Sequence, residues 1–116
     1  RIKSIKNISE KVFRSLNENY KVIIFPEGTR QLENKIGIMK PGIYAIQKFC
    51  KCLVYPIYIK SYLVWPKNTF IKKSNLIKVK ILAPLKFIEK KKEFLTLLKS
   101  NLEIEHKKNE SDEFIN

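Results

Sequence analysis

A short apolar run that ends at a proline places the strongest constraint on this fold. Residues 21–25 (KVIIF) are mostly β-branched and apolar, which is typical of a strand buried on both faces of a sheet. Pro26 cannot donate a hydrogen bond to a neighbouring strand and ends the run, and Gly28 lets the backbone turn close to a ligand. Because α/β sheets place ligands at the carboxyl ends of their strands, we predict a binding loop here.

The side chains of this loop favour an anionic ligand. Glu27, Thr29 and Arg30 are its polar residues, and a planar guanidinium matches two phosphate oxygens at once. The other interpretation is a surface turn with an ordinary Glu–Arg pair. The residue chemistry alone favours the phosphate-binding turn only slightly.

Residues 25–30 spell FPEGTR, which resembles the third sequence block of the glycerolipid acyltransferases that acylate lysophosphatidic acid, the PlsC-like family. In that family the block binds the phosphate of the glycerol-phosphate acceptor. Residues 40–42 are similar to the step that opens the family's next helix, and residues 54–57 resemble its fourth block. The resemblance covers roughly residues 1–104. It implies acceptor phosphate contacts from Glu27, Gly28, Thr29 and Arg30, with Phe25, Pro26, Gly42 and Pro56 as supporting motif residues.

This resemblance implies an α/β fold class: the C-terminal portion of the glycerolipid acyltransferase fold, with a mixed sheet flanked by helices. It implies an enzyme of the 1-acylglycerol-3-phosphate O-acyltransferase type, acting in phospholipid biosynthesis. The acyl donor would be acyl-CoA or acyl-carrier protein, and the acceptor a lysophospholipid. No metal or redox cofactor is implied. An acyltransferase for another lysophospholipid or for glycerol 3-phosphate is an alternative.

The family's catalytic residues are missing from this chain. Its chemistry needs a His and, after four residues, an Asp upstream of the FPEGTR block, because the acceptor hydroxyl needs a base and the base needs an orienting carboxylate. The one histidine, His106, lies near the end and has Ser111 at that offset, so we do not expect it to be the base. We expect the C-terminal part of a longer enzyme, inactive alone, with Arg1 as a further candidate phosphate contact.

A net charge of +13 suggests nucleic acid or an anionic membrane as a partner. The lysines are scattered over every segment without a nucleic-acid motif, so a nucleic-acid-binding module ranks below the enzyme. The charge also suits anionic headgroups or an acidic acyl-carrier protein. Aromatic and basic residues occur together over 62–73, as at a membrane interface, so Trp65 and Phe70 are candidate membrane contacts. The alternative is a loop packed on the sheet. We expect a membrane-associated protein at the cytoplasmic face.

Periodicity predicts the remaining elements. Strands are expected at 53–59 and 78–81, the latter with one wet face, in a domain spanning 1–106. The polar tail 107–116 is expected to be disordered. Cys50 and Cys52 are too few for a zinc site and too close for an unstrained disulfide, so we predict reduced, half-buried thiols. Helices are expected over an N-terminal segment bearing Ile5, Ile8, Val12 and Leu16, over 41–50, and over 90–106 with Phe94, Leu95, Leu98 and Leu102 on the inner stripe.

Overall fold

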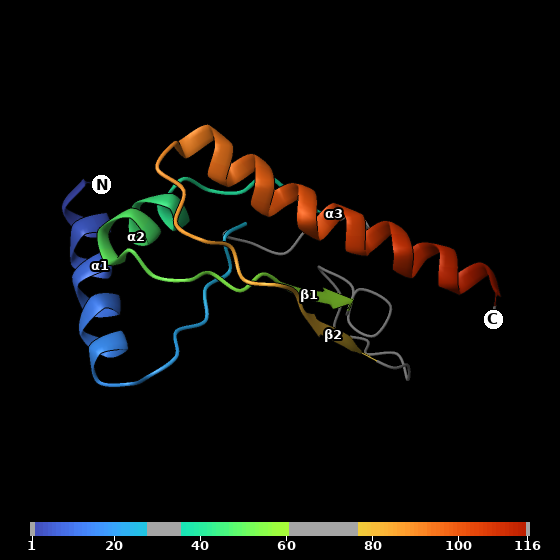
Figure 1. Ribbon diagram of the computed structural model, residues 1–116, viewed down its shortest axis with the longest axis horizontal. Helices are drawn as coiled ribbons and strands as arrows, with labels where there is room; N and C mark the ends of the chain where they lie inside the picture. Colours follow the sequence, from blue (N-terminus) through green and yellow to red (C-terminus); the bar gives the residue numbers. More distant parts are fainter. Residues whose placement is uncertain (1, 28–35, 61–76, 116) are drawn as a thin grey trace, which may run out of the picture.

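The computed structural model describes residues 2–27, 36–60 and 77–115 (Figure 1). Along the chain it contains α1 (Ile2–Asn17), α2 (Gly42–Cys50), β1 (Ile57–Lys60), β2 (Lys78–Ile81) and α3 (Lys91–Ile115). Figure 1 shows α1 and α2 side by side at one end, while α3 runs along the molecule past the two strands. Helices combined with a small sheet are compatible with the predicted α/β class.

The two strands form an antiparallel pair with Ile57 opposite Ile81 and Lys60 opposite Lys78. A bridge between Val54 and Leu85 extends the pairing toward α3. Strand β2 has the bounds predicted for it, whereas β1 begins four residues later and ends one residue later than the strand predicted over 53–59. All four residues of β2 are exposed, so the prediction of one wet face was wrong. Within the described residues the sheet is antiparallel and two-stranded rather than mixed.

The run at residues 21–25 has no regular secondary structure, which contradicts the predicted buried strand. Ile23 is 74% exposed and Phe25 73% exposed. A strand exists only where a neighbour takes its backbone hydrogen bonds, and among the described residues β1 and β2 pair with each other instead. An apolar pattern marks a segment that suits a sheet, but it cannot supply the neighbouring strand.

The core lies where α3 packs against β1 and the segments that contain Met39 and Leu85. Phe94 is completely buried, and Leu98 and Leu102 are nearly so. These residues recur every four positions, which places them on one helix face, so the predicted inner stripe of α3 is confirmed, with Leu95 partly buried beside it. The other buried members of the cluster are Met39, Tyr58 and Leu85.

The apolar stripe predicted for the first helix is only partly buried. Val12 is buried, but Ile5 and Ile8 are exposed. Of the described elements, α1 contacts only α2, and the rings of Phe13 and Phe49 meet edge to face at 5.9 Å between centroids. One neighbouring helix cannot cover the whole stripe, which leaves its remaining apolar residues at the surface.

Helix α3 continues to Ile115 and so includes most of the stretch from residue 107 whose composition predicts disorder. Asn109 is buried; its side-chain amide donates to the Glu105 carbonyl at 2.8 Å, and its own carbonyl accepts from Lys60 Nζ at 3.4 Å. Contacts with β1 therefore stabilise a polar stretch whose composition alone favours disorder. None of the helices in the described ranges is both long and apolar enough to cross a membrane.

Candidate functional site

The predicted phosphate-binding loop is described at its two ends. Phe25, Pro26 and Glu27 close one described range, and residues 36–40 open the next. Gly28, Thr29 and Arg30 lie outside the described residues, as do Arg1, Trp65 and Phe70. The structure therefore defines the geometry of the residues that flank the loop on its two sides.

Two hydrogen bonds join the ends of this segment. Glu27 Oε2 accepts the Gly37 N–H at 2.6 Å, and the Pro26 carbonyl accepts the Lys40 N–H at 2.7 Å. Both distances are at the short end for N–H···O bonds, and a carboxylate acceptor makes the first one charge-assisted. We call this four-residue arrangement the loop base. It brings residues ten and fourteen positions apart into direct contact.

The part of the loop base that follows the loop is packed into the core. Gly37 and Met39 are buried, whereas Ile38 and Lys40 between and after them are exposed. Met39 belongs to the cluster formed around Phe94 and Tyr58. The extended segment after the loop thus alternates between core and solvent, which ties the loop base to the packing of α3.

Helix α2 begins directly after this segment. Pro41 is its N-cap residue, with φ −67°, and its carbonyl accepts the Ala45 N–H at 3.2 Å. Because proline has no N–H and is already restricted to this φ, it suits a helix start, which confirms the predicted helix over 41–50. Gly42 is the first residue of α2, and a Cβ added there would meet nothing within 4 Å, so crowding does not explain this glycine.

Pro56, the other supporting motif residue, lies immediately before β1 and is buried. Its carbonyl accepts the Leu82 N–H at 2.8 Å, which continues the antiparallel pairing beyond β1. The missing N–H of proline therefore costs the sheet nothing here, since the position precedes the regular ladder.

A buried glutamine on α2 binds the segment that precedes α3. Gln47 is 1% exposed; its Oε1 accepts the Ile88 N–H at 2.8 Å and its Nε2 donates to the Ile88 carbonyl at 3.3 Å. The hydroxyl of Tyr44 donates to the Glu89 carbonyl in the same connection. Both polar ends of Gln47 are thereby satisfied inside the protein, as burial requires. Sequence analysis missed this pairing because its partners lie 41 residues apart.

His106 lies in the contact between β1 and α3. Its Nδ1 is 2.8 Å from the hydroxyl of Tyr58, which is buried on β1. Alternate residues of β1 are buried, which puts Tyr58 and Lys60 on one face of the strand. The sequence contains no signal for this arrangement, because the hydropathy of residues 57–60 (IYIK) would favour burial of the two isoleucines, which are exposed.

An ion pair joins β2 to α3. Lys80 Nζ lies 3.2 Å from Glu105 Oε1; the Glu105 side chain is 9% exposed and that of Lys80 58% exposed. Glu105 also accepts from the Asn109 side-chain amide at 3.2 Å. A buried carboxylate needs such partners, and Lys80 and Asn109 supply them.

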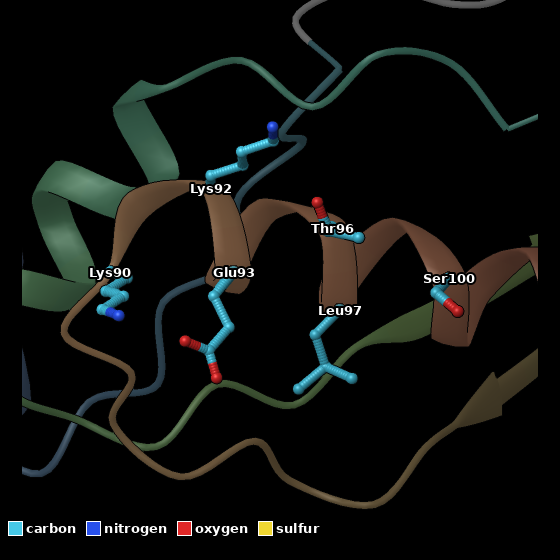
Figure 2. Close-up of a pocket in the computed structure, with 6 residues that line it drawn as sticks. All are labelled: Lys90, Lys92, Glu93, Thr96, Leu97 and Ser100. Carbon is cyan, nitrogen blue, oxygen red and sulfur yellow. The ribbon is translucent and has the colours of Figure 1, made fainter.

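A depression on the first half of α3 has no part in the predicted site (Figure 2). It is formed by residues of one helix and its preceding residue, and Figure 2 shows their side chains pointing to different sides of that helix. Lysines and a glutamate together give it no single charge preference, so we assign it no ligand. Its lining residues are Lys90, Lys92, Glu93, Thr96, Leu97 and Ser100.

The two cysteines are free thiols and partly buried. Cys50 Sγ lies 3.7 Å from the Ser9 carbonyl of α1. Burial raises the pKa of both thiols, and the neighbouring Cys52 raises that of Cys50 further through its charge and hydrogen bond. In the parts of the chain that the structure describes, no group of three or more His, Cys, Asp or Glu side chains could hold a metal ion.

Replacing Cys52 with alanine is expected to lower the pKa of Cys50, because the charge and the hydrogen bond of Cys52 both raise it. Alanine is chosen because a serine hydroxyl would keep a hydrogen-bonding group at this position. Since the thiolate is the nucleophile, iodoacetamide at pH 8 should alkylate Cys50 faster in Cys52→Ala than in the wild-type chain. Alkylation rates measured by mass spectrometry over a range of pH check this; an unchanged or raised pKa of Cys50 would contradict it.

Comparison with known proteins relates this sequence to a family. The model of the family described as Acyltransferase matches residues 1–60, a range that contains FPEGTR and the loop base. A 1-acyl-sn-glycerol-3-phosphate acyltransferase of Cocos nucifera is 31% identical over 86 residues, covering 73% of this chain and 27% of that protein. The chain thus spans about a quarter of the length of this curated relative.

No solved structure matches the chain. The family match nevertheless covers more than half of it, since residues 1–60 of 116 are included. These residues hold the motif that resembles the acceptor-binding block and both hydrogen bonds of the loop base. The chain therefore belongs to the acyltransferase family.

Proposed function

We propose that this chain is the acceptor-binding part of an acyltransferase of the 1-acylglycerol-3-phosphate type. The observation that carries the proposal is the FPEGTR string at residues 25–30 inside the family-matched range. The name of the Cocos nucifera relative, a 1-acyl-sn-glycerol-3-phosphate acyltransferase, supports the choice of acceptor. In the reaction, the acceptor hydroxyl oxygen forms an ester bond with the acyl carbonyl carbon. The thioester C–S bond breaks, and the thiol leaves with the hydroxyl proton.

In this proposal the loop residues bind the acceptor phosphate. Arg30 would donate two parallel hydrogen bonds to phosphate oxygens, Thr29 would add a hydroxyl donor, and Gly28 would let the backbone come close. The base and its orienting carboxylate would come from outside these 116 residues. His106, the one histidine, has Ser111 rather than an aspartate at the spacing that the family requires, so we do not assign it this role.

We also propose that the whole protein works at the cytoplasmic face of an anionic membrane. The net charge of +13 supports this, since each Lys or Arg near an anionic surface contributes about 1 kcal/mol of attraction. Trp65 and Phe70 remain the candidate contacts with the headgroup region. The same charge would favour docking of an acidic acyl-carrier protein as donor, with acyl-CoA as the alternative donor.

The test is acyl transfer by the whole protein, measured by mass spectrometry of the lipid products. With acyl-CoA or acyl-carrier protein as donor, kcat/KM for 1-acylglycerol 3-phosphate should exceed that for glycerol 3-phosphate and for lysophosphatidylcholine by tenfold or more (about 1.4 kcal/mol). A preference for either of those acceptors would replace the proposed one. Absence of transfer to all three would overturn the proposed function. The 116-residue chain alone is expected to be inactive.

A further inference from the structure

Glu27 is the last described residue of the FPEGTR segment. One oxygen of its carboxylate already accepts a hydrogen bond within the protein. Its Oε2 accepts the backbone N–H of Gly37 at 2.6 Å, ten residues further along the chain. Gly37 is buried and Glu27 partly so. The neighbouring Met39 is 5% exposed within the core cluster. The carboxylate therefore links the motif to the part of the chain that is fixed in the core.

The chemistry of a carboxylate makes Glu27 a poor phosphate ligand. An ionised carboxylate only accepts hydrogen bonds, and the oxygens of a phosphate dianion do the same. Two such groups in contact would also repel each other. The amide of Gly37, in contrast, is a donor that a buried backbone position must satisfy. The observed contact is thus the one that the chemistry of both groups favours.

We propose that Glu27 is a positioning residue that closes the loop base, rather than a ligand of the acceptor phosphate. By accepting the Gly37 amide it sets where the two ends of the acceptor loop stand relative to each other and to the core. The bond from the Lys40 N–H to the Pro26 carbonyl, at 2.7 Å, closes the same base through backbone atoms alone. This inference rests on the proposed function, because it concerns the loop that would bind the acceptor.

Three substitutions of Glu27 distinguish the effect of side-chain length from the effect of charge. Glu27→Ala removes the acceptor. Glu27→Gln keeps a side-chain oxygen at the same reach but removes the charge. Glu27→Asp keeps the charge but shortens the side chain by one methylene. A residue that acts by accepting the Gly37 amide should tolerate Gln better than Asp, whereas a residue that acts through its charge should show the reverse order.

Amide hydrogen exchange in the 116-residue chain, followed by NMR, tests the closure without any enzyme activity. Gly37 should exchange about tenfold faster in Glu27→Ala, since a hydrogen bond to a charged group is lost. In Glu27→Gln its exchange rate should stay within about threefold of wild type. The exposed Glu103 on α3 provides the matched control, and Glu103→Ala should leave Gly37 exchange unchanged. Unchanged Gly37 exchange in Glu27→Ala would overturn the proposal.

Acceptor kinetics in the whole protein test positioning. Glu27→Ala should raise the KM for 1-acylglycerol 3-phosphate about tenfold, with kcat and the donor KM changed less than about threefold. Glu27→Gln should recover most of that loss, and Glu27→Asp less. A Gln variant as impaired as Ala, or an unchanged acceptor KM despite faster Gly37 exchange, would overturn the positioning role. If the wild-type protein transferred no acyl group, the proposed function would fail, while hydrogen exchange would still decide the closure.

Discussion

Replacing Phe94 with alanine is expected to lower the free energy of unfolding by about 3–5 kcal/mol. The side chain is completely buried, and its ring lies 6.2 Å from that of Tyr44 on α2. It belongs to the cluster that joins α3 to β1 and to Met39 beside the loop base. Truncation would lose the transfer energy of the ring and leave a cavity that packed neighbours fill only in part. Urea unfolding followed by the helical circular dichroism signal measures the change.

The matched control for Phe94 lies on the same helix. Ile104 is 52% exposed, so Ile104→Ala removes apolar atoms from α3 without opening a cavity and should cost less than about 1 kcal/mol. Both variants place alanine in the same helix, and phenylalanine and isoleucine have similar helix propensities. The difference between the two losses therefore measures the contribution of packing. A Phe94→Ala loss no larger than that of the control would mean that α3 does not bury its inner stripe as described.

Replacing Arg30 with alanine is expected to raise the acceptor KM of the whole acyltransferase about 10- to 100-fold. Hydrogen bonds to charged groups contribute about 1.5–3 kcal/mol, and each 1.4 kcal/mol is a factor of ten in affinity. Arg30→Lys should recover only part of the loss, because an ammonium group cannot bind two phosphate oxygens through a planar fork. Initial rates over a range of 1-acylglycerol 3-phosphate concentrations, at saturating acyl donor, give the KM.

The control for Arg30 must remove one positive charge elsewhere. Lys48 on α2 is well suited, since its side chain is 56% exposed and its ion pair with Glu89 is long, at 4.0 Å. Lys48→Ala should leave the acceptor KM within about twofold of wild type. An equal rise in both variants would show a general effect of net charge, and an unchanged KM in Arg30→Ala would refute its role as the phosphate ligand.

Elements whose signal is local were predictable from the sequence. Pro41 marks the start of α2 because its fixed φ and missing N–H suit a first helical turn. The stripe of α3 was readable from Phe94 to Leu102, since helical spacing repeats within a few residues. The strands β1 and β2 were likewise predicted, β2 with its observed bounds and β1 with bounds that differ from the observed ones at both ends.

Elements that depend on a distant partner were not predictable in this way. The run at 21–25 has the composition of a buried strand, yet Ile23 and Phe25 are exposed because no described strand pairs with them. The polar stretch after residue 107 reads as a disordered tail, yet it is helical where Asn109 meets Glu105 and Lys60. In both cases the composition indicates which secondary structure a segment favours, but contacts with distant residues decide which structure it adopts.

The candidate site divides along the same line. The sequence by itself determined the motif at residues 25–30, the resemblance to the acyltransferase family and the residue types available to bind a phosphate, because these depend on identity and order alone. Only the tertiary structure decided that Glu27 bonds to Gly37 and that His106 lies against Tyr58. Such contacts form only after the chain has folded back on itself, and side-chain hydrogen bonds between distant residues leave no periodic pattern in the sequence.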